Sequence, residues 1–199
     1  LAQGAGANWI DANMRTWNPN TKTYTASGTV PRGQGFFARL MDPDTARQWT
    51  RWTAIDTPGV TPGYWASVRV DSKGQPHMVC YVSGAPSHLR YVNRVGNAWR
   101  TQVVDNSSGT NAGVFASIEL DSLDLPYVAH QVWSPQKPFF TRMLPNGTWT
   151  PSEQIEPQAG SPSNGWGTKL QLFHGQPRVA YGDNTGGVSL IKYAEKTVS

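Results

Sequence analysis

The chain has 199 residues and a formal net charge of +4, with its 17 basic side chains spread along the length rather than gathered in one run. This length suits one domain with a real core, and the spread of charge argues against a nucleic-acid site. No apolar run is long enough to cross a membrane. A single cysteine excludes an intramolecular disulfide, and the low charged fraction of 15% with abundant glycine, proline and tryptophan is typical of a loop-rich, all-β extracellular protein.

The first predicted elements are four short strands within residues 8–56, preceded by a flexible segment over residues 1–7. Turn signals separate these strands, and two of them place proline between turn-favouring residues, where its fixed φ suits a turn. The strands are expected at Asn8 to Trp17, Lys22 to Val30, Gly35 to Met41 and Gln48 to Asp56.

The remaining elements repeat this unit over residues 57–105, 106–156 and 157–199. Tyr64–Ser72 returns as Val114–Ser122 and, more loosely, as Gly165–Leu172. Each copy alternates apolar and polar residues, the period of a strand, and no stretch has sustained helical periodicity.

A second repeated feature is a tryptophan that begins the last strand of a unit. Trp49, Trp99 and Trp149 are 50 residues apart, and each of their strands ends in a β-branched residue followed by a carboxylate. Such a period, built from short strands, indicates stacked units that cannot bury their apolar faces alone.

These units resemble the aromatic-x-S-I-x-L-D-S-x-G-x-P-H blades of a β-propeller family of secreted bacterial proteins. The resemblance covers residues 60–195 and is best over Trp65–Met78. It implies an all-β propeller of about four four-stranded blades, forming a single domain over residues 8–199. The fourth unit has no tryptophan strand, so the segment around Trp9, another chain or missing sequence is expected to complete the propeller. The S-x-D-x-G-x-x-W box of sialidases is absent, which disfavours that activity.

Features present in every unit are most economically explained by structure. Asp71 and Asp121 are predicted to form Asx turns, and the carboxylates Asp105 and Glu156 are predicted to act as caps or turn residues. Cys80 lies in an apolar strand and is expected to be buried and inert.

Function is expected where the repeat breaks, at the end of the units that carries the blade-to-blade loops. Aromatic rings there can stack on sugar faces. The candidate ligand-binding residues are Arg32, Trp65, His88, Phe115, Trp133, Lys137, Trp166 and Asp183.

No enzyme motif or metal-ligand spacing is present, so no catalytic residue, metal or cofactor is predicted. The leading hypothesis is a secreted, non-catalytic binding or scaffold propeller that recognises carbohydrate or a protein partner. One alternative is a glycoside hydrolase or lyase with an acid/base pair such as Asp183 and Glu156. Another is a structural subunit of a larger extracellular assembly, a homo- or hetero-oligomer joined through the open last blade.

Overall fold

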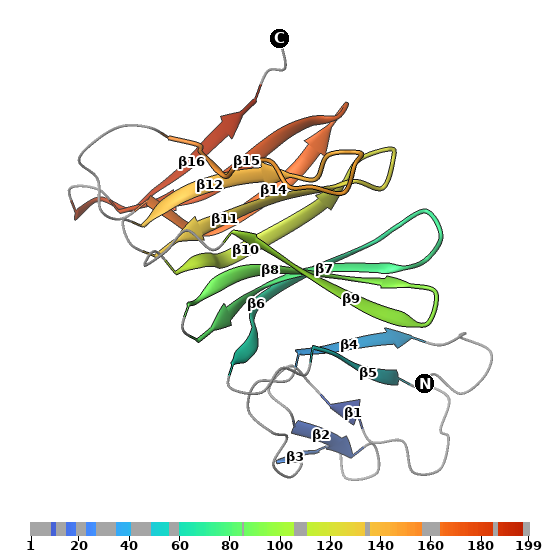
Figure 1. Ribbon diagram of the computed structural model, residues 1–199. Helices are drawn as coiled ribbons and strands as arrows, with labels where there is room; N and C mark the ends of the chain where they lie inside the picture. Colours follow the sequence, from blue (N-terminus) through green and yellow to red (C-terminus); the bar gives the residue numbers. More distant parts are fainter. Residues whose placement is uncertain are drawn as a thin grey trace. The chain divides into compact units, whose positions relative to one another are not determined.

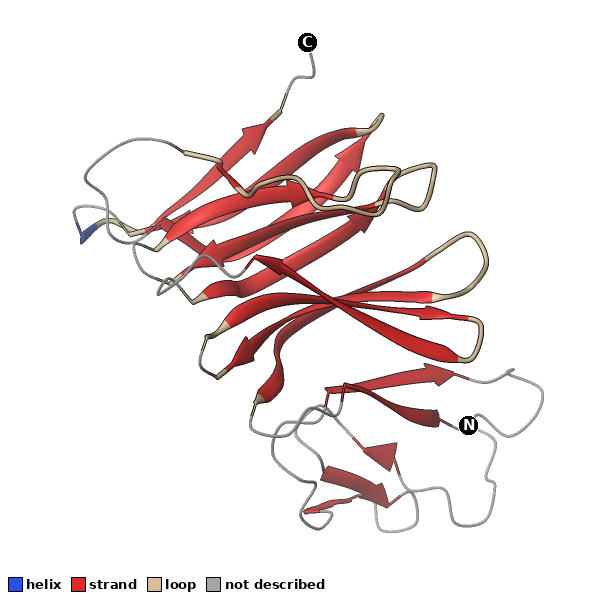
Figure 2. Cartoon of the chain, viewed as in Figure 1, coloured by secondary structure: helices blue, strands red, loops and turns tan. Residues whose placement is uncertain are grey.

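The computed structural model describes residues 9–10, 15–18, 23–26, 35–40, 49–55, 60–84, 86–105, 111–133, 136–156, 164–184 and 187–196. Residues 9–52, 55 and 164–166 are described by their backbone alone where they fall in these ranges. Most residues in these ranges lie in strands, turns and irregular segments (Figure 2). No helix within the ranges is long and apolar enough to span a membrane. The chain divides into two compact units, Leu1–Asp56 and Thr57–Ser199.

The first unit contains two sheets. Strands β1 (Trp9–Ile10), β2 (Arg15–Asn18) and β3 (Thr23–Ala26) form one, while β4 (Gly35–Leu40) pairs with β5 (Trp49–Ile55) in the other. The sequence predicted one four-stranded sheet here, with a single strand from residue 8 to 17. That segment instead folds back on itself, since Trp9 pairs with Trp17.

The second unit contains three antiparallel sheets whose strand order follows the chain (Figure 1). The first sheet is formed by β6 (Thr61–Val70), β7 (Pro76–Ser83), β8 (His88–Val95) and β9 (Ala98–Asp105). The second is formed by β10 (Ala112–Leu120), β11 (Pro126–Val132), β12 (Lys137–Arg142) and β13 (Glu153–Gln154). The third is formed by β14 (Asn164–Phe173), β15 (Gln176–Asp183) and β16 (Leu190–Glu195). The predicted all-β fold is confirmed.

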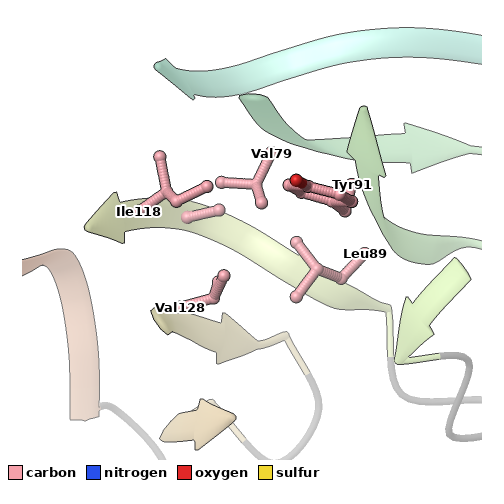
Figure 3. Packing of buried hydrophobic residues seen from close by; sticks show 6 residues of the cluster. Val79, Leu89, Tyr91, Ile118 and Val128 are labelled. Atoms are coloured by element: carbon pink, nitrogen blue, oxygen red, sulfur yellow. The ribbon is translucent and has the colours of Figure 1, made fainter. Parts of the chain in front are cut away.

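The core of the second unit lies between successive sheets. One cluster joins Val79, Leu89 and Tyr91 of the first sheet to Ala116, Ile118 and Val128 of the second (Figure 3). A second cluster repeats this between the second and third sheets, with Phe140 and Val179 among its members. Full burial of a Leu or Ile side chain contributes about 1.5–3 kcal/mol, so these contacts hold the sheets together.

The first strands of the sheets also touch, and a serine links each pair. Strand β10 lies against both β6 and β14. The Ile118 amide donates to Ser67 Oγ at 3.3 Å, and the Leu170 amide donates to Ser117 Oγ at 3.0 Å. The serine of the repeated aromatic-x-Ser motif therefore satisfies a main-chain donor of the neighbouring sheet.

The turns between the first and second strands of the first two sheets are Asx turns, as predicted for Asp71 and Asp121. Asp71 Oδ1 accepts hydrogen bonds from the amides of Lys73 at 2.9 Å and Gln75 at 2.7 Å. Asp121 makes the corresponding two bonds in the second sheet, both at 2.9 Å. The Asp121 turn also reaches its neighbour, because the Asp124 carboxylate accepts from the Ser72 amide at 3.0 Å.

Candidate ligand-binding face

The first strand of each sheet has an irregularity near its beginning. The pairing register shifts between Tyr64 and Ser67 in β6, and again at the corresponding points of β10 and β14. Trp65 and Phe115 adopt φ values of 50° and 52°, and Gly167 has 66°. For a residue other than glycine the left-handed region costs roughly 1–2 kcal/mol. Strain of this kind persists where surrounding contacts impose it, often at functional sites.

The irregularity places aromatic rings together across two sheets. The centroid of the Trp65 ring lies 5.7 Å from Tyr64, 5.5 Å from Tyr81 and 5.2 Å from Phe115. We call Tyr64, Trp65, Tyr81 and Phe115 the aromatic patch. Tyr64 is 49% exposed and Trp65 is 41% exposed. The patch thus combines tilted ring packing with an open surface on which an apolar face of a ligand could stack.

Two of the predicted ligand-binding residues, Trp65 and Phe115, are therefore brought into contact. Tyr81 was not among the predicted residues, although its ladder partner is Tyr64. The sequence does not show which ring an aromatic residue inside a strand will contact. The pairing of Tyr81 with the exposed Tyr64 is known only from the register of β6 and β7.

The predicted tryptophans beyond the patch have different settings. Trp133 follows β11, is 40% exposed, and its amide donates to the Asn111 carbonyl at 3.3 Å. That bond holds it beside the beginning of β10, the strand that carries Phe115. Trp166 lies in β14, which is described there by its backbone alone, and Arg32 lies outside the described residues.

His88 and Lys137 were expected in loops at the ligand-binding end, but the structure places both in strands. Each is the first residue of a strand and each is 6% exposed. The reason is that each pairs with the last part of the preceding strand, His88 with Val82 and Lys137 with Val132, so the hairpin extends over them. The Arg90 side chain donates to His88 Nε2 at 3.1 Å, which places this histidine in an internal contact.

Asp183 belongs to a charged cluster between the second and third sheets. Lys192 Nζ lies 2.7 Å from Asp183 Oδ2 and 2.6 Å from Glu156 Oε1, and these hydrogen bonds raise the pKa of the lysine. The Tyr181 hydroxyl donates to Glu156 Oε2 at 3.1 Å. Burial is the main cause, and the charge of Glu156 the second, of a rise in the pKa of Tyr181 to about 12. Both carboxylates share one ammonium group, whereas a general acid must hold a proton.

Asp105 has the position of Glu156 in the preceding unit, and its contact is similar. Its Oδ2 lies 3.5 Å from Nε2 of His130, which is fully buried. Burial lowers the pKa of this histidine, although the nearby charge of Asp105 opposes that effect. His130 and Tyr181 occupy the same ladder position in the second strands of their sheets. The repeated carboxylates therefore tie one sheet to the next rather than only capping a turn.

The other chemically active groups offer no clear reaction centre. Among the described ranges, no three His, Cys, Asp or Glu side chains are grouped so that they could hold a metal ion. Cys80 is 4% exposed, and burial raises the pKa of its thiol, so little of it is thiolate at neutral pH. A pocket of about 230 Å³ lies between the second and third sheets, lined by Phe140, Ile155, Val179 and neighbouring residues. It lies near the β14–β15 turn and the beginning of β15, at the opposite end of the third sheet from the beginning of β14.

Comparison with known proteins identifies the fold. No protein-family model matches the sequence, and no curated protein matches it. An ulvan lyase of polysaccharide lyase family PL25 superposes with a TM-score of 0.52 at 12% identity, covering 96% of this chain and 55% of the lyase. An exo-1,5-α-L-arabinanase from a bovine ruminal metagenomic library gives 0.50 at 11% identity, covering 82% and 64%.

At these identities the likeness is one of fold, and the protein is an all-β protein of the β-propeller type. The chain spans little more than half of the lyase. A fucose lectin from Kordia zhangzhouensis also matches, with a TM-score of 0.48 at 17% identity over 67% of this chain and 99% of the lectin.

Proposed function

We propose that this protein is a carbohydrate-binding propeller that holds a saccharide on the aromatic patch without turning it over. The observation that carries this proposal is the exposure of Tyr64 and Trp65 at the strained beginning of β6. An exposed ring forgoes part of the roughly 1.5–3 kcal/mol that burial of a large apolar side chain contributes. The left-handed backbone recurs at Trp65, Phe115 and Gly167 and is therefore a feature of the fold. A binding role accounts for the exposure of the two rings.

The geometry of the patch suits the apolar face of a sugar ring. The exposed rings of Tyr64 and Trp65, with centroids 5.7 Å apart, present a broad apolar surface, and Tyr64 adds its phenol hydroxyl group. Trp133, at the same end of the second sheet, offers a third exposed ring. Proteins of the same fold include a polysaccharide lyase and an arabinanase, which supports saccharides as the ligand class.

Binding without turnover is favoured over catalysis by the setting of the acidic residues. The pair that the sequence left open, Asp183 and Glu156, is brought together, but both carboxylates bind the Lys192 ammonium group. A saccharide ligand also fits a location outside the cell, and we propose secretion or display at the cell surface. A purely scaffolding role would leave the exposed rings of Tyr64 and Trp65 without a ligand.

The proposal is tested by titrating the full chain with a panel of soluble neutral and anionic polysaccharides, including arabinan and ulvan, while following tryptophan fluorescence and gel retardation. Wild-type protein should bind at least one of them. Trp65→Ala should weaken that binding at least about tenfold, the effect of losing one stacking contact. Leu123→Ala, a change of an exposed apolar side chain in the β10–β11 turn, is the matched control and should bind as wild type.

Two results would overturn the proposal. One is the absence of binding to every polysaccharide, and the other is equal affinity of Trp65→Ala and wild type. The same mixtures should be assayed for new reducing ends and unsaturated products. Their appearance would assign the protein to the hydrolases or lyases instead.

A further inference from the structure

Two apolar side chains of the third sheet are exposed at positions that are buried in the other sheets. Ile191 is 90% exposed and Tyr193 is 59% exposed. Counted along the ladder from the proline near the beginning of each second strand, Ile191 is equivalent to Leu89, which is 0% exposed. Tyr193 is equivalent to Tyr91 at 3% and Phe140 at 5%. We call Ile191 and Tyr193 the tail face.

The buried equivalents show what covers such a face. Leu89 packs into the core formed with β10 and β11 of the following sheet (Figure 3). The approach is so close that a Cβ added to Gly113 would lie 2.8 Å from Leu89 Cα. Trp149 lies in the connection between β12 and β13 rather than at the beginning of a strand, and Tyr91 meets it edge-on with ring centroids 5.3 Å apart. The tail face therefore has the chemistry of a surface onto which the first strand of another sheet packs.

The opposite side of the unit carries the complementary surface. Val68 and Val70 in β6 are 41% and 56% exposed, whereas Ile118, the equivalent of Val68 in β10, is 0% exposed. Gly63 has φ of 98°, close to the 106° of Gly113, so β6 already has the backbone shape that receives a Leu89-like side chain. We call Gly63, Val68 and Val70 the head face.

We propose that the tail face binds the head face of a second copy of this chain. The two faces are the two halves of an interface that the chain already forms twice, between its first and second sheets and between its second and third. The contact joins different surfaces of the two copies, so it is head-to-tail. A head-to-tail contact closes into a ring where its rotation permits, and we expect that closed form here rather than a fibre.

The test measures the mass of the full chain in solution by light scattering during gel filtration, over a wide range of protein concentrations. Wild type should form a discrete oligomer of at least two copies of the 21.8 kDa chain. Ile191→Lys on the tail face and Val68→Lys on the head face should each give a smaller species. Leu123→Lys, which is 72% exposed in the β10–β11 turn, is the matched control and should keep the wild-type mass.

Mixing the two variants separates a head-to-tail contact from a symmetric one. In the mixture the intact tail of Val68→Lys can bind the intact head of Ile191→Lys, so a two-chain species should return although neither variant forms it alone. Circular dichroism should show unchanged β-structure in both variants, because the substituted side chains are exposed.

Three outcomes would overturn the inference. A wild-type chain that is monomeric at every concentration would exclude the head-to-tail contact. A tail variant that retains the wild-type mass would show that Ile191 is outside the contact. Finally, failure of the mixed variants to associate would show that the two faces do not meet each other.

Discussion

The two ends of the sheets in the second unit differ in how they use the repeated sequence. At the end with the turns between first and second strands, the first two sheets agree, and their side chains satisfy main-chain donors. Asp71 and Asp121 each accept two amide hydrogen bonds, and Asp124 reaches across to Ser72. At the other end the units diverge, and Trp65 and Trp133 are exposed.

This difference indicates that the two ends of the strands have different roles. The turn end stabilises the stack of sheets, and stability is lost if its residues change. The opposite end repeats the left-handed backbone at Trp65, Phe115 and Gly167 but carries different side chains there, and Trp65 is 41% exposed. Substitutions at the turn end should therefore change unfolding, while substitutions at the other end should change binding.

The largest expected effect is at the turn end, for Trp149→Ala. Trp149 packs on Tyr91, and its indole donates to Gln102 at 3.1 Å, so the change removes a contact between two sheets. We expect a loss of about 3 kcal/mol in unfolding free energy, the lower part of the range for large aromatic residues because the ring is only half-buried. Urea denaturation measures it, and a loss below about 1 kcal/mol would contradict the assigned packing.

The next effect is for Asp121→Ala. The change leaves two amides of the β10–β11 turn without their acceptor, and we expect a loss of about 2 kcal/mol. Asp121→Asn keeps an acceptor oxygen and should lose clearly less. Equal losses for the two variants in urea denaturation would show that charge, rather than the Asx turn, stabilises this end.

At the opposite end, Trp65→Gly should separate binding from stability. Glycine relieves the left-handed strain but removes the ring, and these effects oppose each other, so unfolding free energy should change by less than about 1 kcal/mol. Affinity for the polysaccharide that wild type binds should fall about tenfold, or about 1.4 kcal/mol. Strong destabilisation with unchanged affinity would reverse the division between the two ends.

The smallest effect concerns His130, midway between the ends. Its pKa is lowered in the folded protein, so below the unfolded value of about 6.5 the unfolded chain binds a proton that the folded chain does not. Stability should therefore fall as pH decreases from 7 toward 5, by less than about 1 kcal/mol at pH 6 for this group. His130→Gln should flatten this part of the curve in urea denaturation at several pH values. An equally steep curve would assign the dependence to other groups.

The sequence predicted the repeated features of the fold because repetition makes them visible. The tryptophan spacing, the Asx turns and the strands of the last three units all appear several times, so each copy supports the others. The first unit was predicted less well. Its segment around Trp9 has no equivalent elsewhere, and only the ladder shows that β1 folds back on β2.

The candidate site could be predicted only in part. Trp65 and Phe115 were found because they begin repeated segments, but their positive φ depends on a register shift that no local signal encodes. The burial of His88 follows from how far a hairpin extends. The meeting of Asp183 and Glu156 at one lysine requires two sheets to be in place.

The serine links between first strands have a consequence for how the protein opens locally. The second sheet is joined on both sides, accepting one such bond and donating the other, whereas the described part of the third sheet is joined through Leu170 on one side. Local opening costs least where the fewest contacts are lost. In a dissociated chain, the amides of β16 should therefore exchange with solvent deuterium well before those of β11.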